Sequence, residues 1–294
     1  MRLGAAMLAA AIACGGCAGT HAAPGAPHGI LFVAGPWVRT NHGGLPPRDT
    51  RAYRDGRLVA TYHARVLPAR DRAAASLLYD ELAGTARPIA GGPSSAFDPC
   101  PVSYHLSGRD IELSPDGRHG VCLGPGDDAV VVFDVPRWRS TRRTIFRMSA
   151  YGGAASWLDD RRIAVMEHRP ECPRGVQKFE GFRGVAIIDL DGRVLERGPC
   201  VSTVLARPRG LIYERYHVAF DTLTSVLHAV TGNPIPRLEF SSDGGRTWRD
   251  GRPQFADADG RVFYFDAQAW EGTLWVDGLP TAFRRSSRAG WAMP

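Results

Sequence analysis

The residues that could carry chemistry are spread thinly along this 294-residue chain. Its nine histidines show no paired spacing of the kind that binds zinc, and Glu167-His168 fits the end of a strand. Segments 189–192 and 257–260 begin like calcium loops but lack the later ligands, which predicts hairpin turns. Neither Ser76 nor Ser156 lies in a Gly-x-Ser-x-Gly elbow. The sequence therefore predicts no metal site, no cofactor and no catalytic residue, and the protein is expected not to be an enzyme.

The N-terminal cysteines offer a different chemistry, the covalent attachment of lipid. Arg2 precedes an apolar run that ends near residue 13, fits a secretory signal and is too short to span a membrane as a mature helix. The run closes on Cys14 and Cys17 among small residues, which resembles the bacterial lipoprotein signal. Ile12 and Ala13 suit the two places before Cys14, so Cys14 is the expected lipidation site and Cys17 the alternative. A soluble secreted protein cut at an Ala-x-Ala site is the other interpretation.

This resemblance implies an organisation for the whole chain. Residues 1–13 would be a lipoprotein signal peptide, residues 14–28 a lipidated flexible tether rich in Ala, Pro and Gly, and residues 29–294 a single domain. The residue after the acylated cysteine would be Gly15 or Ala18, not the Asp that resembles inner-membrane retention. The resemblance therefore implies an outer-membrane lipoprotein that faces the periplasm.

Four further cysteines lie inside the expected domain: Cys100, Cys122, Cys172 and Cys200. An even number in an exported chain predicts two disulfides, with three possible connectivities. Pairing Cys100 with Cys122 and Cys172 with Cys200 would close the shortest loops.

Composition excludes several classes of protein. A chain with 44% hydrophobic and 22% charged residues, and with no apolar run of about 18 residues, is neither disordered nor a polytopic membrane protein. The net charge of +6 could suit nucleic acid, but the arginines are scattered among 30 acidic residues. Only Lys178 is a lysine, a bias typical of a genome rich in G and C. We expect a protein partner and membrane contact through the N-terminal lipid, but no nucleic-acid partner.

The elements that must position these residues are strands, which recur at a period near 50 residues. Apolar strands that end in an acidic residue finish at Asp80, Asp134, Asp189 and Asp243. A second apolar strand precedes each, at residues 58–62, 120–123, 163–167 and 225–230. Asp-Gly turns between these strands predict hairpins. The one helix expected is a short one within residues 71–82.

Such a period is typical of a β-propeller, in which each small sheet packs against two neighbours. Units near residues 50–90, 105–148, 153–198, 205–250 and 255–294 would form five blades. Residues 30–38 would add a sixth fragment, or close the ring by completing the last blade. The expected fold is all-β, a β-propeller with five to six small antiparallel blades. A β-sandwich or two β-domains is the alternative.

Two turn motifs support the propeller. Ser241-Ser242-Asp243-Gly244-Gly245-Arg246-Thr247-Trp248 matches the Asp-box (BNR-like) hairpin, Ser-x-Asp-x-Gly-x-Thr-Trp, of sialidase-like and related propellers. Its Ser and Asp are expected to accept hydrogen bonds from the turn, its second Gly to take a positive φ, and its Trp to cover the hairpin. Residues 113–118, Leu-Ser-Pro-Asp-Gly-Arg, resemble a turn of TolB-type periplasmic propellers. Both motifs concern the fold alone.

The Asp-box also suggests a sialidase-like glycosidase, which needs an arginine triad, a Tyr nucleophile activated by a Glu, and an Asp acid. The Phe/Tyr-Arg-Ile-Pro motif of that family is absent, since residues 235–237 read Ile-Pro-Arg. Tyr213 and Glu214 are sequence neighbours, so on a strand they point to opposite faces. A glycosidase is therefore the least favoured function.

A wider resemblance bears on function. Cys14, the Asp-box hairpin and Gly290-Trp291 resemble features of the periplasmic lipoproteins that act as immunity partners of type VI secreted phospholipase effectors. The resemblance implies a non-catalytic lipoprotein that binds a toxin in the periplasm and blocks its active site or its access to the membrane. A propeller scaffold that assists envelope assembly is the alternative function.

Overall fold

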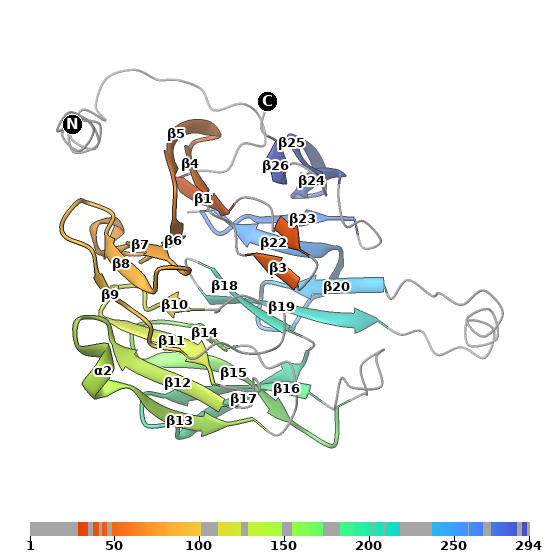
Figure 1. The fold of residues 1–294 in the computed structure, drawn as a ribbon. Coiled ribbons are helices and arrows are strands. Elements are labelled where there is room, and N and C mark those ends of the chain that lie inside the picture. Colours follow the sequence, from red (N-terminus) through yellow and green to blue (C-terminus); the bar gives the residue numbers. More distant parts are fainter. Residues whose placement is uncertain are drawn as a thin grey trace.

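The computed structural model describes residues 29–34, 38–40, 43–45, 49–100, 111–124, 129–148, 155–172, 183–201, 203–207, 210–217, 237–257, 259–266, 272–286 and 290–292. Within these ranges six small antiparallel sheets form the blades of a β-propeller (Figure 1). The predicted all-β propeller is confirmed, and the β-sandwich and two-domain alternatives are wrong.

Each blade comes from one stretch of chain, so strands that follow one another in sequence are neighbours in the sheet. Blade 1 also carries a hairpin of β2 (Val38–Thr40) and β3 (Gly43–Leu45) after its first strand. In chain order the strands are β1 (Ile30–Ala34), β4 (Thr50–Arg54) and β5 (Arg57–Tyr62) in blade 1; β6 (Arg65–Leu67), β7 (Leu77–Asp80), β8 (Thr85–Pro88) and β9 (Ser95–Ala96) in blade 2; β10 (Glu112–Leu113), β11 (His119–Leu123), β12 (Ala129–Asp134) and β13 (Arg143–Arg147) in blade 3; β14 (Ala155–Trp157), β15 (Arg162–His168), β16 (Arg183–Asp189) and β17 (Val194–Cys200) in blade 4; β18 (Thr203–Arg207), β19 (Gly210–His217), β20 (Arg237–Ser241) and β21 (Arg249–Asp250) in blade 5; and β22 (Arg252–Ala256), β23 (Val262–Phe265), β24 (Gly272–Val276), β25 (Leu279–Ser286) and β26 (Gly290–Ala292) in blade 6.

The first strands of the blades pack near one another. Strand β1 contacts β6, and β10, β14, β18 and β22 contact one another in succession. Apolar side chains fill the spaces between neighbouring blades, with one cluster between blades 2 and 3 and a larger one across blades 3 to 5. Both faces of a blade are thus covered, which explains why β12 and β16 each contain five consecutive buried residues instead of an alternating pattern.

The unit predicted at residues 50–90 is wrong, because it joins strands of two blades. Strands β4 and β5 belong to blade 1, where β1 pairs with β4 from Ile30 opposite Arg54 to Ala34 opposite Thr50. Residues 30–34 therefore begin a sixth blade and do not complete the last one. Blade 2 starts at β6.

The acidic residues at the predicted strand ends are not all equivalent. Asp80 ends the second strand of blade 2, whereas Asp134 and Asp189 end the third strands of blades 3 and 4. The regular spacing from Asp80 to Asp134 therefore reflects chance and not a structural repeat. The strand predicted at residues 225–230 lies outside the described residues, and the second strand of blade 5 is β19.

Helical structure is sparse and differs from the prediction. Residues 71–82 contain one 3₁₀ turn, η1 (Ala73–Ala75), and then β7, because Leu77, Leu78 and Tyr79 are buried in blade 2 as strand residues. An unpredicted helical segment, η3 (Val135–Arg137) and α2 (Trp138–Thr141), follows β12. No helix in the described ranges is long and apolar enough to cross a membrane.

The four domain cysteines form two disulfides. Cys100 pairs with Cys122 across a Cα–Cα distance of 6.4 Å and ties the segment after blade 2 to β11 of blade 3. Cys172 pairs with Cys200 across 5.4 Å and closes a loop within blade 4. This is the pairing with the shortest loops, one of the three that the sequence left open.

Candidate functional site

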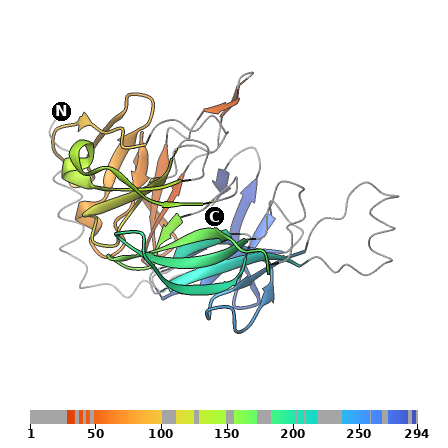
Figure 2. The same ribbon diagram turned by 90° about the horizontal axis from the view of Figure 1, so that it is seen from below.

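A groove with a volume of 490 Å³ lies between the outer strands of blade 2 and the helical segment of blade 3. Figure 1 shows α2 on the left, near β9, and Figure 2 shows from below that α2 lies against the same blade. The volume falls within the range of protein ligand sites.

The floor of this groove is apolar and held in place by aromatic contacts. Phe97 is almost fully buried, and its ring meets Tyr79 and Phe133 edge-on at centroid distances of 5.7 and 5.9 Å. Because Tyr79 belongs to blade 2 and Phe133 to blade 3, the same contacts fix the distance between the blades. Leu77 completes the floor.

Trp138 connects the two walls. Its ring packs edge-on against Phe97 at 6.2 Å, and its indole N–H donates to the main-chain oxygen of Ala96 over 3.2 Å. The side chain of Trp138 is only partly buried, so its ring remains available as an apolar surface within the groove.

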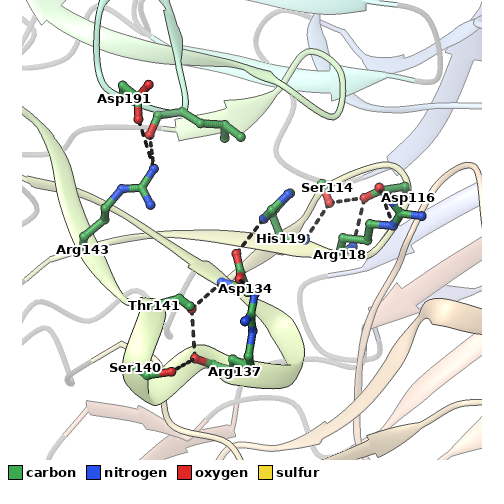
Figure 3. Close-up of polar contacts among 11 residues, drawn as sticks. Ser114, Asp116, Arg118, His119, Asp134, Arg137, Ser140, Thr141, Arg143 and Asp191 are labelled. Atoms are coloured by element: carbon green, nitrogen blue, oxygen red, sulfur yellow. Dashed lines mark hydrogen bonds and ion pairs between the residues drawn. The ribbon is translucent and has the colours of Figure 1, made fainter.

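The helical wall is braced at its start by Asp134, as Figure 3 shows. The main-chain N–H of Asp134 donates to the Thr141 hydroxyl over 2.9 Å, and that hydroxyl donates to the main-chain oxygen of Arg137 over 2.9 Å. The Asp134 carboxylate accepts a hydrogen bond from Arg137 over 2.9 Å and lies 3.1 Å from His119 Nδ1. These hydrogen bonds hold the helical wall of the groove in one conformation.

The charged residues that line the groove are all arginines: Arg87, Arg137 and Arg139. Arg137 forms its ion pair with Asp134 yet keeps 73% of its side chain exposed. Arg139 lies over the Trp138 ring at 5.3 Å. Among the described residues no carboxylate pairs with Arg87 or Arg139. Three arginines from two different blades thus meet at one groove.

His119 and Asp134 form the histidine–carboxylate pair nearest this groove (Figure 3). They face each other across β11 and β12, and the His119 ring stacks on Trp157 at 6.4 Å. The nearby Ser114 hydroxyl donates to Asp116 over 2.7 Å and accepts the His119 main-chain N–H over 3.0 Å. Ser114 therefore stabilises its turn, and the three residues do not form a relay from nucleophile to base to acid.

The other residues considered as catalytic or metal-binding candidates form contacts that stabilise the fold. Ser76 accepts the main-chain N–H of Ala69, and Ser156 donates to Glu112 over 2.7 Å. Glu167 lies near the end of β15 and pairs with Arg197. The predicted hairpin turns are confirmed, because the first aspartate of each accepts two main-chain N–H groups of its own turn.

The Asp-box turn forms the contacts expected of it. Ser241 accepts the Gly245 N–H over 2.9 Å, and Asp243 accepts the main-chain N–H and the hydroxyl of Thr247 over 2.9 and 2.6 Å. The hydrogen bonds from Thr247, together with that from Ser241, hold the pKa of Asp243 far below its usual value. Gly245 has φ +85°, and the Trp248 indole donates back to Gly245.

Tyr213 and Glu214 lie on β19 of blade 5, on opposite faces of the strand. Both are buried. Burial, with the charge of Glu196, raises the pKa of the Tyr213 phenol above its usual value. Across blade 5, Arg215 lies over the Trp248 ring at 3.9 Å and pairs with Glu239. This arginine is therefore engaged in packing the Asp-box hairpin.

The predicted lipidation sites Cys14 and Cys17, with the signal peptide and tether, lie outside the described residues.

Sequence reasoning missed the groove, although one signal was present: four of the seven residues from 137 to 143 are arginine, with Trp138 among them. The other wall comes from a different blade and carries no such signal.

No family model matches the chain, and no curated protein sequence matches it. Several solved structures share its architecture. The propeller domain of the trilobed protease from Pyrococcus furiosus has a TM-score of 0.47 and 13% identity, covering 88% of this chain and 83% of that one. TolB from Acinetobacter baumannii has a TM-score of 0.39 and 12% identity, covering 90% of this chain and 69% of that one.

Acylaminoacyl peptidase from Pyrococcus horikoshii has a TM-score of 0.44 and 9% identity, and the match covers 80% of this chain but only 37% of the peptidase. The chain thus spans well under half of that relative. The prediction that the protein is not an enzyme is withdrawn, because the propeller fold neither excludes catalysis nor establishes it.

Proposed function

We propose that this protein is a periplasm-facing lipoprotein that binds a protein partner and acts as an immunity protein against a type VI secreted lipase effector. The observation that carries the proposal is the groove between blades 2 and 3, where an apolar floor lies among exposed arginines. A propeller is compatible with protein binding, because its packed blades hold such a surface rigid. Tryptophan and arginine are the residues most enriched at the energetic centres of protein interfaces.

The role against a lipase effector is supported by the lipoprotein-like N-terminus and the Asp-box hairpin with the later Gly290-Trp291 pair. A lipid on Cys14, or on Cys17, would hold the propeller at the outer membrane, where an incoming lipase would act. Binding there would block the active site of the lipase or its access to lipid.

A competition experiment tests this role. Cells that lack the gene are mixed with sister cells that carry an active type VI secretion system, and survivors are counted. We expect the deletion strain to be killed and to recover when the gene is restored, while sister cells with an inactive system kill neither strain. Equal survival of the deletion and parent strains would disprove the immunity role, and cross-linking to outer-membrane assembly proteins would favour a scaffold.

The localisation is tested separately. Cys14→Ser and Cys17→Ser variants are fractionated, and the mass of the mature protein is measured. Loss of the lipid mass and of membrane association in only one variant identifies the acylated cysteine. A parent protein that carries no lipid would refute the anchor.

A further inference from the structure

We propose that the groove between blades 2 and 3 recognises an acidic, extended segment of the protein partner, with carboxylates on Arg87 and Arg139 and an apolar side chain between them on Trp138. This inference rests on the proposed function only in that the partner is a protein. It adds the chemistry of the recognised segment and the place where it binds.

Charge is the first argument. The charged residues lining the groove are all arginines, and Arg87 and Arg139 have no carboxylate partner among the described residues. They come from opposite walls, Arg87 from β8 of blade 2 and Arg139 from α2 of blade 3. A guanidinium matches a carboxylate with two parallel hydrogen bonds, so two such sites favour a segment with acidic residues at intervals.

The apolar floor is the second argument. Leu77 and Phe97 are buried beneath the groove, and the partly buried Trp138 ring supplies the apolar surface that lines it. A segment with charges alone would leave this surface in contact with water. A segment that also carries an aromatic or aliphatic side chain would bury it, with a gain of roughly 25 cal/mol for each Å².

The edge of blade 2 limits how the segment can bind. Strand β9 is the outermost strand of that blade, and an added strand would need its outward-facing main-chain groups. The main-chain oxygen of Ala96 is already taken by the Trp138 indole over 3.2 Å. An added strand would have to share this oxygen with the indole, which favours recognition through side chains in the groove over extension of the sheet.

The groove is also formed before binding. Asp134 and Thr141 brace the helical wall, and Phe97 fixes the distance between the blades. A preformed site avoids part of the entropy that ordering would cost.

The test uses the peptide Glu-Glu-Phe-Glu-Glu-Leu with a fluorescent label, and the anisotropy of the label reports binding to the full chain. The double variant R87E/R139E is compared with the parent and with R57E/R161E, a matched control that makes the same charge change at exposed residues outside the groove. We expect R87E/R139E to weaken binding at least about tenfold and R57E/R161E to weaken it less than about threefold. The peptides Gln-Gln-Phe-Gln-Gln-Leu and Glu-Glu-Ala-Glu-Glu-Ala should both bind more weakly than the first.

Three results would overturn the inference: equal binding of the acidic and Gln peptides, equal losses in the two double variants, or tighter binding of single-stranded DNA or anionic vesicles through the same arginines. Circular dichroism verifies that every variant is folded. Failure here is distinct from failure of the proposed function. If R87E/R139E still protects cells fully in the competition experiment, the immunity role stands and the groove is not the place of recognition.

Discussion

Trp157 and Glu112 join two neighbouring blades through their main chains and side chains together. The Trp157 main-chain N–H donates to the Glu112 carboxylate over 3.2 Å, and its indole N–H donates to the Glu112 main-chain oxygen over 3.1 Å. Arg70 of blade 2 also donates to the main-chain oxygen of Trp157 over 2.6 Å. Three consecutive blades therefore meet at one fully buried tryptophan.

The substitution Trp157→Phe tests this junction. The smaller ring leaves the Glu112 main-chain oxygen without its indole donor in a partly buried place, which should lower the free energy of unfolding by about 1–3 kcal/mol. Urea unfolding measures the change. Trp138→Phe is the matched control, because its indole bond is exposed and water can replace it. Equal unfolding midpoints for the two variants would contradict the role of Trp157.

A comparison of two glycines with positive φ distinguishes the cost of backbone strain from the cost of crowding by an added Cβ atom. Gly117 has φ +74° and would place a Cβ atom 2.6 Å from the Ala75 Cβ, whereas Gly244 has φ +80° and open space around it. Gly244→Ala should cost about 1 kcal/mol from strain alone. Gly117→Ala should cost about 2–4 kcal/mol, since overpacking adds to the strain. Thermal unfolding measures both, and a larger loss for Gly244→Ala would refute the explanation.

Low pH should reduce the stability that the Asp-box turn contributes to the fold. Asp243 has a lowered pKa in the folded protein, so its contribution to stability is complete above the unfolded value of about 3.9 and declines as the pH falls below it. The stability difference between parent and Asp243→Asn should therefore be constant from about pH 5 to 7 and shrink below about pH 4.

The stability of Thr247→Val should depend on pH less than that of the parent but more than that of Asp243→Asn. This substitution removes the hydroxyl that donates to Asp243 over 2.6 Å. Urea midpoints at a series of pH values measure both variants. A difference between parent and Asp243→Asn that does not change with pH would exclude the ionised hydrogen-bonded carboxylate.

The Cys100–Cys122 disulfide should stabilise the contact between blades 2 and 3. Changing both cysteines to alanine is expected to cost about 2–5 kcal/mol, and reductant should lower the unfolding temperature of the parent. Calorimetry with and without dithiothreitol measures this. The variant with Cys172 and Cys200 both changed to alanine is the comparison, since that bond lies within one blade. No change on removing Cys100 and Cys122 would contradict the prediction.

Local features were predictable because their causes lie within a few residues. The Asp-box turn depends on hydrogen bonds between Ser241, Asp243 and residues at most four positions later, and the apolar runs of β12 and β16 identify strands covered on both faces. The propeller fold followed from such strands and turns. The blade boundary near residue 62 did not, because it depends on the pairing of β1 with β4.

Most strands, the tight turns and the even number of domain cysteines could be recognised from the amino-acid sequence, since these depend on side-chain pattern and on bonds between near neighbours. Which cysteines pair, which strands share a blade and where a groove opens depends on how the blades pack in three dimensions. Arg87 and Arg139 belong to different blades and approach the same groove because Phe97 and Phe133 pack the blades together. A surface assembled across such an interface has no local signature, because its parts are joined by burial and not by proximity along the chain.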